Sequence, residues 1–271
     1  MAWRITEDVD EFLAGAGDFL RARPVENTVL LTVADGVRRG AYPAGALFGW
    51  AAEGGAYLRT APRPGLVSAM SPDSARDLVA ALDGRELTGV IGPDDVVEVF
   101  TVEWQRRTRG HAQVRGRQRL YRLGSLKSPV PHPSGGARKA VPADRELLVG
   151  WIGNFYRDVG TVQPRPAQFF DETVSYGGIM LWEDAGRPVS MAAHTRLDAG
   201  MVRIHAVYTP VAHRARGYGG AITTAISQAA RDAGAAEVVL FTDLANPTSN
   251  ALYQRLGYVP LEDRTMMEFT A

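Results

Sequence analysis

Cysteine is absent from the 271 residues of this chain. Its absence excludes disulfides, thiolate metal sites and a cysteine nucleophile. Lysine is scarce as well, because Lys127 and Lys139 are the two lysines among 30 basic residues. The 30 acidic residues balance the basic ones, so the composition predicts neither a nucleic-acid partner nor a membrane partner.

Long apolar runs are missing too. No stretch of about 18 apolar residues occurs, so no membrane-spanning helix is predicted. The first eight residues are acidic at Glu7 and Asp8 and lack an apolar secretion segment. Hydrophobic residues make up 45% of the chain, which is typical of a folded soluble protein, and the length suits two domains. We expect a cytoplasmic protein.

Residues 125–137 have the composition of a linker. Three prolines at alternate positions are followed by paired glycines, namely Pro129, Pro131, Pro133, Gly135 and Gly136. Such a stretch is extended and is not expected to hold a sheet or a helix. We therefore predict one domain at 1–124 and a second at 138–271.

The first half alternates helix and strand patterns. Thr6 is predicted to open a helix, with Glu7 and Asp8 in its first turn. Ser71 and Pro72 are suited to the cap and first position of another helix. The predicted elements are the helix from Thr6, strands near 45–51, 56–60 and 65–70, helices at 71–82 and 94–108, and a strand at 111–123.

The second half repeats this kind of order. Its first helix is expected to bury one apolar face made of Leu147, Leu148, Trp151, Ile152 and Phe155. A glycine-rich loop, a helix, a strand, a short helix and a final strand end the chain. The predicted elements before that loop are helices at 144–157 and 166–176 and strands at 179–184, 188–196 and 200–209. This order predicts an α/β layered domain.

The strand before the glycine-rich loop carries two different faces. Strand side chains alternate, so the even positions from Val202 to Tyr208 should meet a helix layer. The odd positions from Met201 to Thr209 should line a cleft. On this reading His205 and Val207 share the cleft face.

The loop that follows has the features of an anion site. Arg214, Arg216, Gly217, Gly219 and Gly220 lie close together before a helix. Free N–H groups at a helix N-terminus and the helix dipole attract anions, and glycine lets the backbone approach them closely. The spacing matches neither the Walker A motif nor the dinucleotide-binding G-x-G-x-x-G.

A second motif lies downstream. Asn246 and Pro247 are suited to the cap and first position of a short helix. Asn250 and Tyr253 then share one face of that helix, and Gly257 ends it.

Together these motifs resemble the GNAT superfamily of N-acetyltransferases, over about 178–269. Arg214-x-x-Gly217-x-Gly219 is similar to the family's R/Q-x-x-G-x-G/A loop, and Asn246 to Tyr253 is similar to its helix with Asn and Tyr. The resemblance implies that backbone of Ala206, Val207, Tyr208 and Thr209 pairs with acyl-pantetheine. It also implies pyrophosphate binding by Arg214, Ala215, Arg216, Gly217, Tyr218, Gly219 and Gly220.

The same resemblance implies the remaining roles. Asn246 or Asn250 would contact pantetheine, and Tyr253 would protonate the leaving thiolate. The Val207 N–H is suited to stabilise the oxyanion. His205 is the first candidate for the general base, His194 is a weaker one, and a water-relayed base is the alternative.

The first half also has a GNAT-like order. However, Ser71-Pro72-Asp73 stands where the glycine loop would be, and the Asp73 carboxylate would repel pyrophosphate. No Asn and Tyr helix follows. We predict a tandem protein with a degenerate N-terminal half, each half a mixed, mostly antiparallel sheet flanked by helices. The fold class is α/β (α+β by some schemes). A mixed α+β domain of another kind is the alternative for the first half.

The predicted function is acyl transfer from acetyl-CoA, or another short acyl-CoA, to a primary amine of a small molecule by direct attack in a ternary complex. No metal is expected. Two alternatives are a non-catalytic acyl-CoA-binding module and an acyltransferase acting on protein N-termini or lysines.

Overall fold

The computed structural model describes residues 2–160 and 165–270. The chain divides into two compact units. Unit 1 comprises Met1–Leu120, Thr242–Asn246 and Leu261–Ala271, and unit 2 comprises Tyr121–Phe241 and Pro247–Pro260. This division differs from the predicted one, in which a linker at 125–137 separates 1–124 from 138–271. The difference arises because most of the last strand pairs within the sheet of unit 1.

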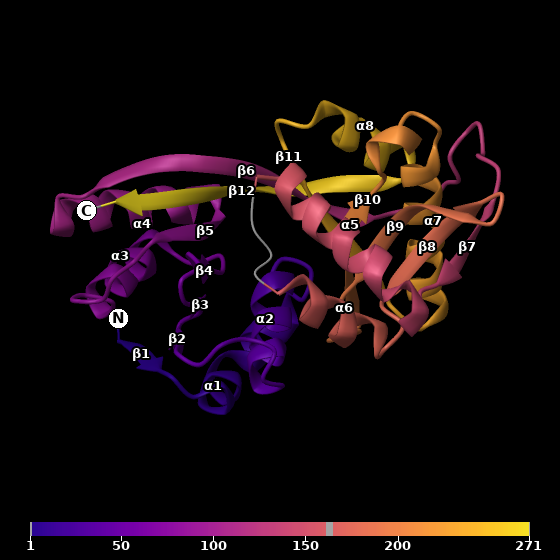
Figure 1. Ribbon diagram of the computed structural model, residues 1–271. Helices are drawn as coiled ribbons and strands as arrows, with labels where there is room; N and C mark the ends of the chain where they lie inside the picture. The colour runs from indigo at the N-terminus through magenta and orange to yellow at the C-terminus, as the bar shows by residue number, and fades with distance from the viewer. Residues whose placement is uncertain (1, 161–164, 271) are drawn as a thin grey trace. The chain divides into compact units, whose positions relative to one another are not determined.

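Unit 1 is a mixed sheet with the strand order β1-β2-β3-β4-β5-β12-β6 (Figure 1). Its described strand pairs are antiparallel except β4 and β5. The elements of the first half are β1 Trp3–Thr6, α1 Val9–Ala22, α2 Thr28–Arg38, β2 Ala46–Ala51, β3 Ala56–Thr60, β4 Gly65–Val67, α3 Pro72–Ala81, β5 Gly89–Pro93, α4 Asp94–Thr108 and β6 His111–Leu123.

Most predicted elements of the first half are confirmed, and α4 and β6 have the predicted bounds. The predicted start of α1 is wrong. Thr6 ends β1, and the Asp8 carboxylate caps α1 by accepting from the N–H of Asp10 at 2.8 Å. Either residue type can cap a helix, but Thr6 is held in the strand by its pairing with Phe48.

Unit 2 contains β7, β8, β9, β10 and β11. It also contains the end of β6, from Tyr121, and the start of β12, to Pro260. The elements of the second half are β7 Gly136–Lys139, α5 Arg145–Asp158, α6 Pro166–Val174, β8 Ile179–Asp184, β9 Arg187–His194, β10 Met201–Tyr208, α7 Tyr218–Asp232, β11 Glu237–Asp243, α8 Pro247–Arg255 and β12 Tyr258–Thr270.

Both halves of the chain follow one element order, β-α-α-β-β-β-α-β-α-β. Each sheet also separates its helices in the same way. In unit 1, adjacent residues Leu47 and Phe48 of β2 enter different cores, one under α3 and α4 and the other under α1 and α2. In unit 2, α5 and α6 cover one face and α7 and α8 the other. This repetition supports the tandem prediction.

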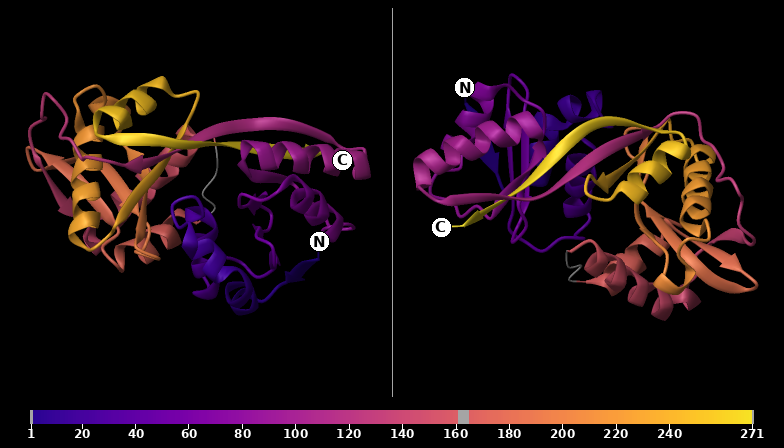
Figure 2. Two further views of the ribbon diagram at one scale, coloured as in Figure 1. Left: turned by 180° about the vertical axis from the view of Figure 1, so that it is seen from behind. Right: turned by 90° about the horizontal axis from the view of Figure 1, so that it is seen from above.

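The cores are close to the predicted ones. On α5, Leu148, Trp151 and Ile152 are buried as predicted. Leu147 is exposed, so that prediction is wrong. In unit 1, β12 lies beside β6 (Figure 2), and Arg119 of β6 forms a paired salt bridge with Asp263 of β12, the closer contact being 2.6 Å.

The segment Gly124–Gly135, here called the proline strap, is attached to unit 2. The N–H of Gly124 donates to Gly257 O at 3.0 Å, and the N–H of Lys127 donates to Leu256 O at 2.9 Å. The indole Nε1 of Trp182 donates to Ser134 O at 2.8 Å. The last two residues of the predicted linker already belong to β7, which pairs with β8. Among the described residues there is no helix with the length and apolarity needed to cross a bilayer.

The attachment of the strap predicts different costs for two alanine substitutions. Gly257 and Gly234 both follow helices, with φ of +93° and +94°. A Cβ on Gly257 would lie 1.8 Å from Ser125 O, whereas a Cβ on Gly234 would have no neighbour within 4 Å. Gly234→Ala should lose about 1–2 kcal/mol of unfolding free energy from backbone strain alone. Gly257→Ala should lose more, because the strap must also move.

Denaturant unfolding of the two variants measures this difference. Equal losses would contradict the close approach of the strap to Gly257.

Candidate functional site

Strands β10 and β11 separate partway along their length. Their parallel pairing runs from Met201 with Glu237 to Ile204 with Leu240. Both strands continue beyond that point, β10 to Tyr208 and β11 to Asp243. No described pair joins them after Ile204, so backbone groups of β10 beyond this residue are not used by β11. An extended ligand can use such groups as a further strand would.

A bulge in β10 accompanies this separation. Between His205 and Tyr208, β10 advances three residues while β9 advances two, from Ala193 to Met191. Within the bulge, Ala206 has φ +50°, a left-handed conformation that a residue with a Cβ adopts at a cost of about 1–2 kcal/mol. Strain of this kind is concentrated at functional sites.

The bulge overturns the predicted alternation of faces. Val202 and Ile204 enter the core under α7, but the even positions Ala206 and Tyr208 enter the core under α5 and α6. Val207 packs against the α7 core instead. The extra residue at the bulge reverses the alternation, because strand side chains change face with every residue.

His205 and Val207 therefore lie on opposite faces, and the prediction that they share one is wrong. The His205 imidazole meets the edge of the Phe169 ring, 5.5 Å between centroids, on the α6 side. Tyr253 of α8 belongs to the same core as Val207. The two predicted catalytic side chains are thus on different sides of the sheet of unit 2.

The loop after β10 forms the glycine-rich turn in which an anion site is predicted, and anion binding there stays a prediction. Gly217 precedes α7 with φ +83°, and Ala215 has φ +61°. The N–H of Ala221 donates to Gly217 O at 3.0 Å and closes the first turn. The N–H groups of Tyr218 and the two residues after it precede that bond and have no acceptor within the helix. These donors fit a pyrophosphate group.

The two loop arginines differ. Nε of Arg214 donates to Thr209 O at 2.9 Å, and its Nη2 donates to Asp158 Oδ2 at 2.6 Å. Its backbone N–H donates to Val211 O at 3.2 Å. Arg214 is therefore engaged within unit 2, and its predicted contact with the pyrophosphate stays a prediction. Arg216 lies near Asp184 and Tyr218 at the start of α7.

Tyr253 lies in an apolar setting. It is 7% exposed and packs between Tyr121 and Tyr258 at ring distances of 6.4 and 6.0 Å. Burial raises the pKa of Tyr253 to about 12, so its hydroxyl stays protonated at neutral pH. One turn earlier, Asn250 accepts a hydrogen bond from the Tyr121 hydroxyl at 2.9 Å.

Other predicted contacts are also used within the protein. The carbonyl of Tyr208 accepts from Ser190 Oγ at 3.0 Å, and that of Thr209 accepts from Arg214. Ala206 and Val207 are the more suitable partners for an extended ligand. Asn246 directly precedes α8, as predicted, and its N–H donates to Asp243 O at 3.0 Å.

The predicted base lies in a setting that opposes its charge. Burial, followed by the charges of Arg203 and His194, lowers the pKa of His205 to about 3. Burial also lowers the pKa of His194, whose Nδ1 lies 2.7 Å from Thr195 O. Both imidazoles are neutral at pH 7. A base with a pKa near 3 has little driving force to take a proton from an ammonium group.

The corresponding helix of unit 1 lacks the anion site. There the Ser71 side chain caps α3 by accepting the Ser74 N–H at 3.2 Å, and Pro72 has no N–H. Asp73 adds a negative charge to this first turn. The predicted degeneracy of the first half thus has a structural basis.

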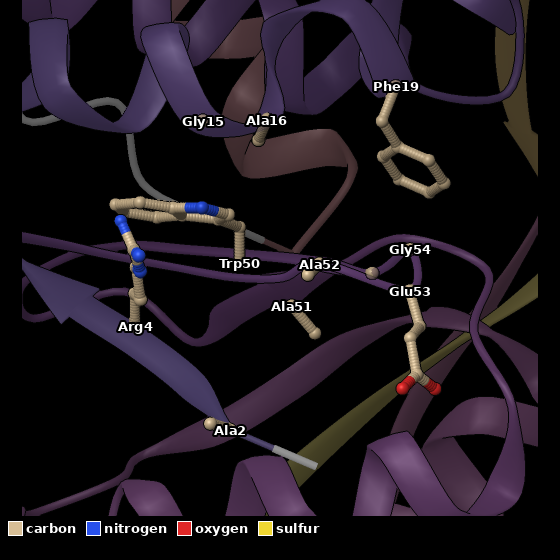
Figure 3. Close-up of a pocket in the computed structure, with 11 residues that line it drawn as sticks. Ala2, Arg4, Gly15, Ala16, Phe19, Trp50, Ala51, Ala52, Glu53 and Gly54 are labelled. Carbon is tan, nitrogen blue, oxygen red and sulfur yellow. The ribbon is translucent and has the colours of Figure 1, made fainter.

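Unit 1 has a pocket of about 440 Å³ between β1, α1 and the β2–β3 turn (Figure 3). Arg4 and Trp50, direct neighbours on paired strands, form one wall. Trp50 is 7% exposed, because its ring lies against Phe12 and the backbone of Gly15. The indole therefore offers little surface to a ligand, and the other lining residues are mostly alanine and glycine.

Comparison with known proteins supports the assignment of unit 2. Residues 147–258 match the model of the Acetyltransferase (GNAT) family. No curated protein matches the chain. A solved Drosophila protein has a TM-score of 0.70 at 15% identity, covering 99% of this chain and 98% of its own.

Two further solved structures share the fold over nearly the whole chain. A GNAT acetyltransferase from Colwellia psychrerythraea has a TM-score of 0.64 at 11% identity and covers 99% of both chains. A glucosamine N-acetyltransferase region of a fungal multi-domain β-N-acetylglucosaminidase has a TM-score of 0.58 at 11% identity, covering 98% of this chain and 38% of its own.

The separated strands β10 and β11 and the turn before α7 both lie within the residues that match the GNAT family model. By this match, residues 147–258 form a GNAT acetyltransferase domain.

The setting of His205 predicts a pH dependence of stability. Its pKa falls from 6.5 to about 3 on folding, so between these values the unfolded chain binds a proton that the folded protein does not. The contribution of neutral His205 to the unfolding free energy is complete above pH 6.5 and is lost as the pH falls toward 3. Relative to His205→Gln, the wild type should lose about 1.4 kcal/mol of unfolding free energy per pH unit in this window.

Urea unfolding of both proteins between pH 7 and pH 5 measures the difference. Parallel curves would contradict the lowered pKa and the neutral state of His205.

Proposed function

We propose that the protein transfers an acetyl or other short acyl group from acyl-CoA to the primary amine of a small molecule, by direct attack in a ternary complex. The observation that carries this proposal is the presence, in one unit, of two sets of available backbone groups. One set is on β10 beyond Ile204, and the other is at the first turn of α7. The first suits an amide-containing arm, and the second suits a pyrophosphate.

Each part of acyl-CoA has its own proposed contacts. The N–H groups of Tyr218, Gly219 and Gly220, with the charge of Arg216, hold the pyrophosphate. The backbone of Ala206 and Val207 holds the pantetheine arm. Bound acyl-CoA supplies an activated thioester carbonyl, and the Val207 N–H is the proposed donor to its oxygen.

The acceptor amine is proposed to approach from the α6 side of β10. Phe169 of α6 and the His205 imidazole line this side, 5.5 Å apart between ring centroids. An aromatic ring and a neutral imidazole suit a small organic amine better than an exposed protein segment. The fold shared with a glucosamine N-acetyltransferase region is consistent with a small amine acceptor.

The reaction requires two proton movements. The amine nitrogen attacks the thioester carbon, the carbon–sulfur bond breaks, and the proton of the ammonium group must leave. Because the pKa of His205 is about 3, we favour water-relayed proton removal over direct removal by this imidazole. The Tyr253 hydroxyl is protonated at neutral pH, and Tyr253 is the proposed general acid that passes this proton to the leaving thiolate.

Addition of acyl-CoA tests the binding part of the proposal. Acetyl-CoA at 100 times its Kd should stabilise the folded protein by about 2.7 kcal/mol, raising its unfolding temperature. Differential scanning calorimetry with and without acetyl-CoA measures this shift. An unchanged unfolding temperature at millimolar acetyl-CoA would contradict the proposal.

Substitution of Tyr253 separates catalysis from binding alone. Tyr253→Phe should lower kcat by about 10²-fold, the lower range for a general acid. The matched control is Tyr258→Phe in the same core, whose hydroxyl bonds Ser227 at 2.6 Å. That control should lose about 1 kcal/mol of stability and keep its kcat. Thiol release with a panel of small amines measures turnover.

Unchanged turnover in Tyr253→Phe would remove its proposed role. If the protein bound acetyl-CoA but acylated no small amine, the non-catalytic binding module or the protein acyltransferase would take the place of the proposed function.

A further inference from the structure

The proline strap follows α7 toward its N-terminus. Thr224 of α7 donates its hydroxyl to Lys127 O at 3.3 Å. Farther along, Pro129 lies 3.4 Å from where a Cβ on Gly220 would stand. Pro133 lies 3.6 Å from the corresponding position on Gly217. Because these two glycines belong to the anion-binding turn, the strap covers the outer side of that turn.

A hydrogen-bonded network joins the end of the strap to the same turn. Tyr218, the first residue of α7, is 4% exposed and donates its hydroxyl to Asp184 Oδ2 at 2.6 Å. The Tyr218 hydroxyl is the main cause of the lowered pKa of Asp184, and the Ser134 side chain, which lies close to this carboxyl group, contributes to it. The main chain of Ser134 is fixed in turn by the Trp182 indole. The Asp184 carboxylate thus ties the turn to the β8–β9 hairpin, and the Trp182 indole of the same hairpin ties the strap to it.

Anion binding at a helix end depends on the direction of its N–H groups. The amides of Tyr218, Gly219 and Gly220 point at one ligand only while the first turn keeps its orientation. Glycine neighbours leave the backbone free to move, so the turn needs support from elsewhere. The buried Tyr218 ring and its bond to Asp184 provide that support. In unit 1 the corresponding first residue of α3 is Pro72, which has no such side chain.

We propose that Tyr218, held by Asp184, positions the pyrophosphate-binding turn, and that the end of the proline strap at Ser134 supports this arrangement. Tyr218 acts through its side chain on the orientation of backbone donors, in addition to offering its own N–H. This inference rests on the proposed function, because it assumes that acyl-CoA binds at α7.

The test compares four proteins: wild type, Tyr218→Phe, Ser134→Ala and the matched control Ser128→Ala. Ser128 is an exposed serine of the same strap. Isothermal calorimetry with CoA gives Kd, and steady-state kinetics gives kcat and both KM values. The unfolding temperature of each protein is measured without ligand.

Tyr218→Phe should raise the Kd of CoA and the KM of acetyl-CoA by roughly tenfold, as expected for one lost positioning hydrogen bond. Ser134→Ala should act in the same direction with a smaller change. The kcat and the KM of the amine should stay near their wild-type values, and Ser128→Ala should match the wild type throughout. A purely structural role would lower the unfolding temperature without selectively raising the KM of acetyl-CoA.

The outcomes separate the two claims. If the wild type binds CoA and Tyr218→Phe binds it equally well, the positioning role is overturned and the proposed function stands. If Ser128→Ala weakens binding as much as Ser134→Ala, the network is not responsible and the inference is overturned. If Tyr218→Phe does not fold, Ser134→Ala decides the question. A wild type that binds no CoA overturns the proposed function and this inference together.

Discussion

Strand β10 stops pairing with β11 after Ile204, and the arrangement of unit 2 around its site depends on that separation. The bulge at Ala206 bends the strand at the same place and reverses the faces of the residues beyond it. Val207 then faces the α7 core that contains Tyr253, while His205 faces α6. The strained conformation of Ala206 therefore places the proposed cofactor contacts and the proposed acceptor contacts on opposite faces of β10.

The two units show how much the element order alone determines. Both have the same succession of helices and strands, and both place a helix after a strand that has a parallel neighbour. In unit 2 that helix begins with Gly217 in a left-handed conformation. In unit 1 it begins with Ser71, Pro72 and Asp73. The Ser71 side chain already accepts a backbone N–H, Pro72 has no N–H to donate, and the Asp73 carboxylate repels an anion. The fold provides the position, and a few residues at the helix start decide whether it can bind phosphate.

Much of this could be predicted from local sequence. Helix caps, proline positions and apolar periodicity gave α3, α4, β6 and β8 close to their observed bounds. The bulge could not be predicted. A glycine at position 206 would have suggested a positive φ, but the alanine found there does not. Arg214 looked free for phosphate, yet it bonds Asp158, which is 56 residues away. Contacts of this kind depend on tertiary packing, as does the pairing of the last strand in unit 1. The roles of Tyr253 and the loop amides stay predictions.

Hydrogen–deuterium exchange with and without acetyl-CoA tests the central claim most directly, because it observes the backbone donors themselves. The account predicts that acetyl-CoA slows exchange at the amides of Ala206, Val207 and residues 215–220, and leaves those at the start of α3 unchanged. Unaltered exchange in the α7 turn, or protection at α3 instead, would contradict it.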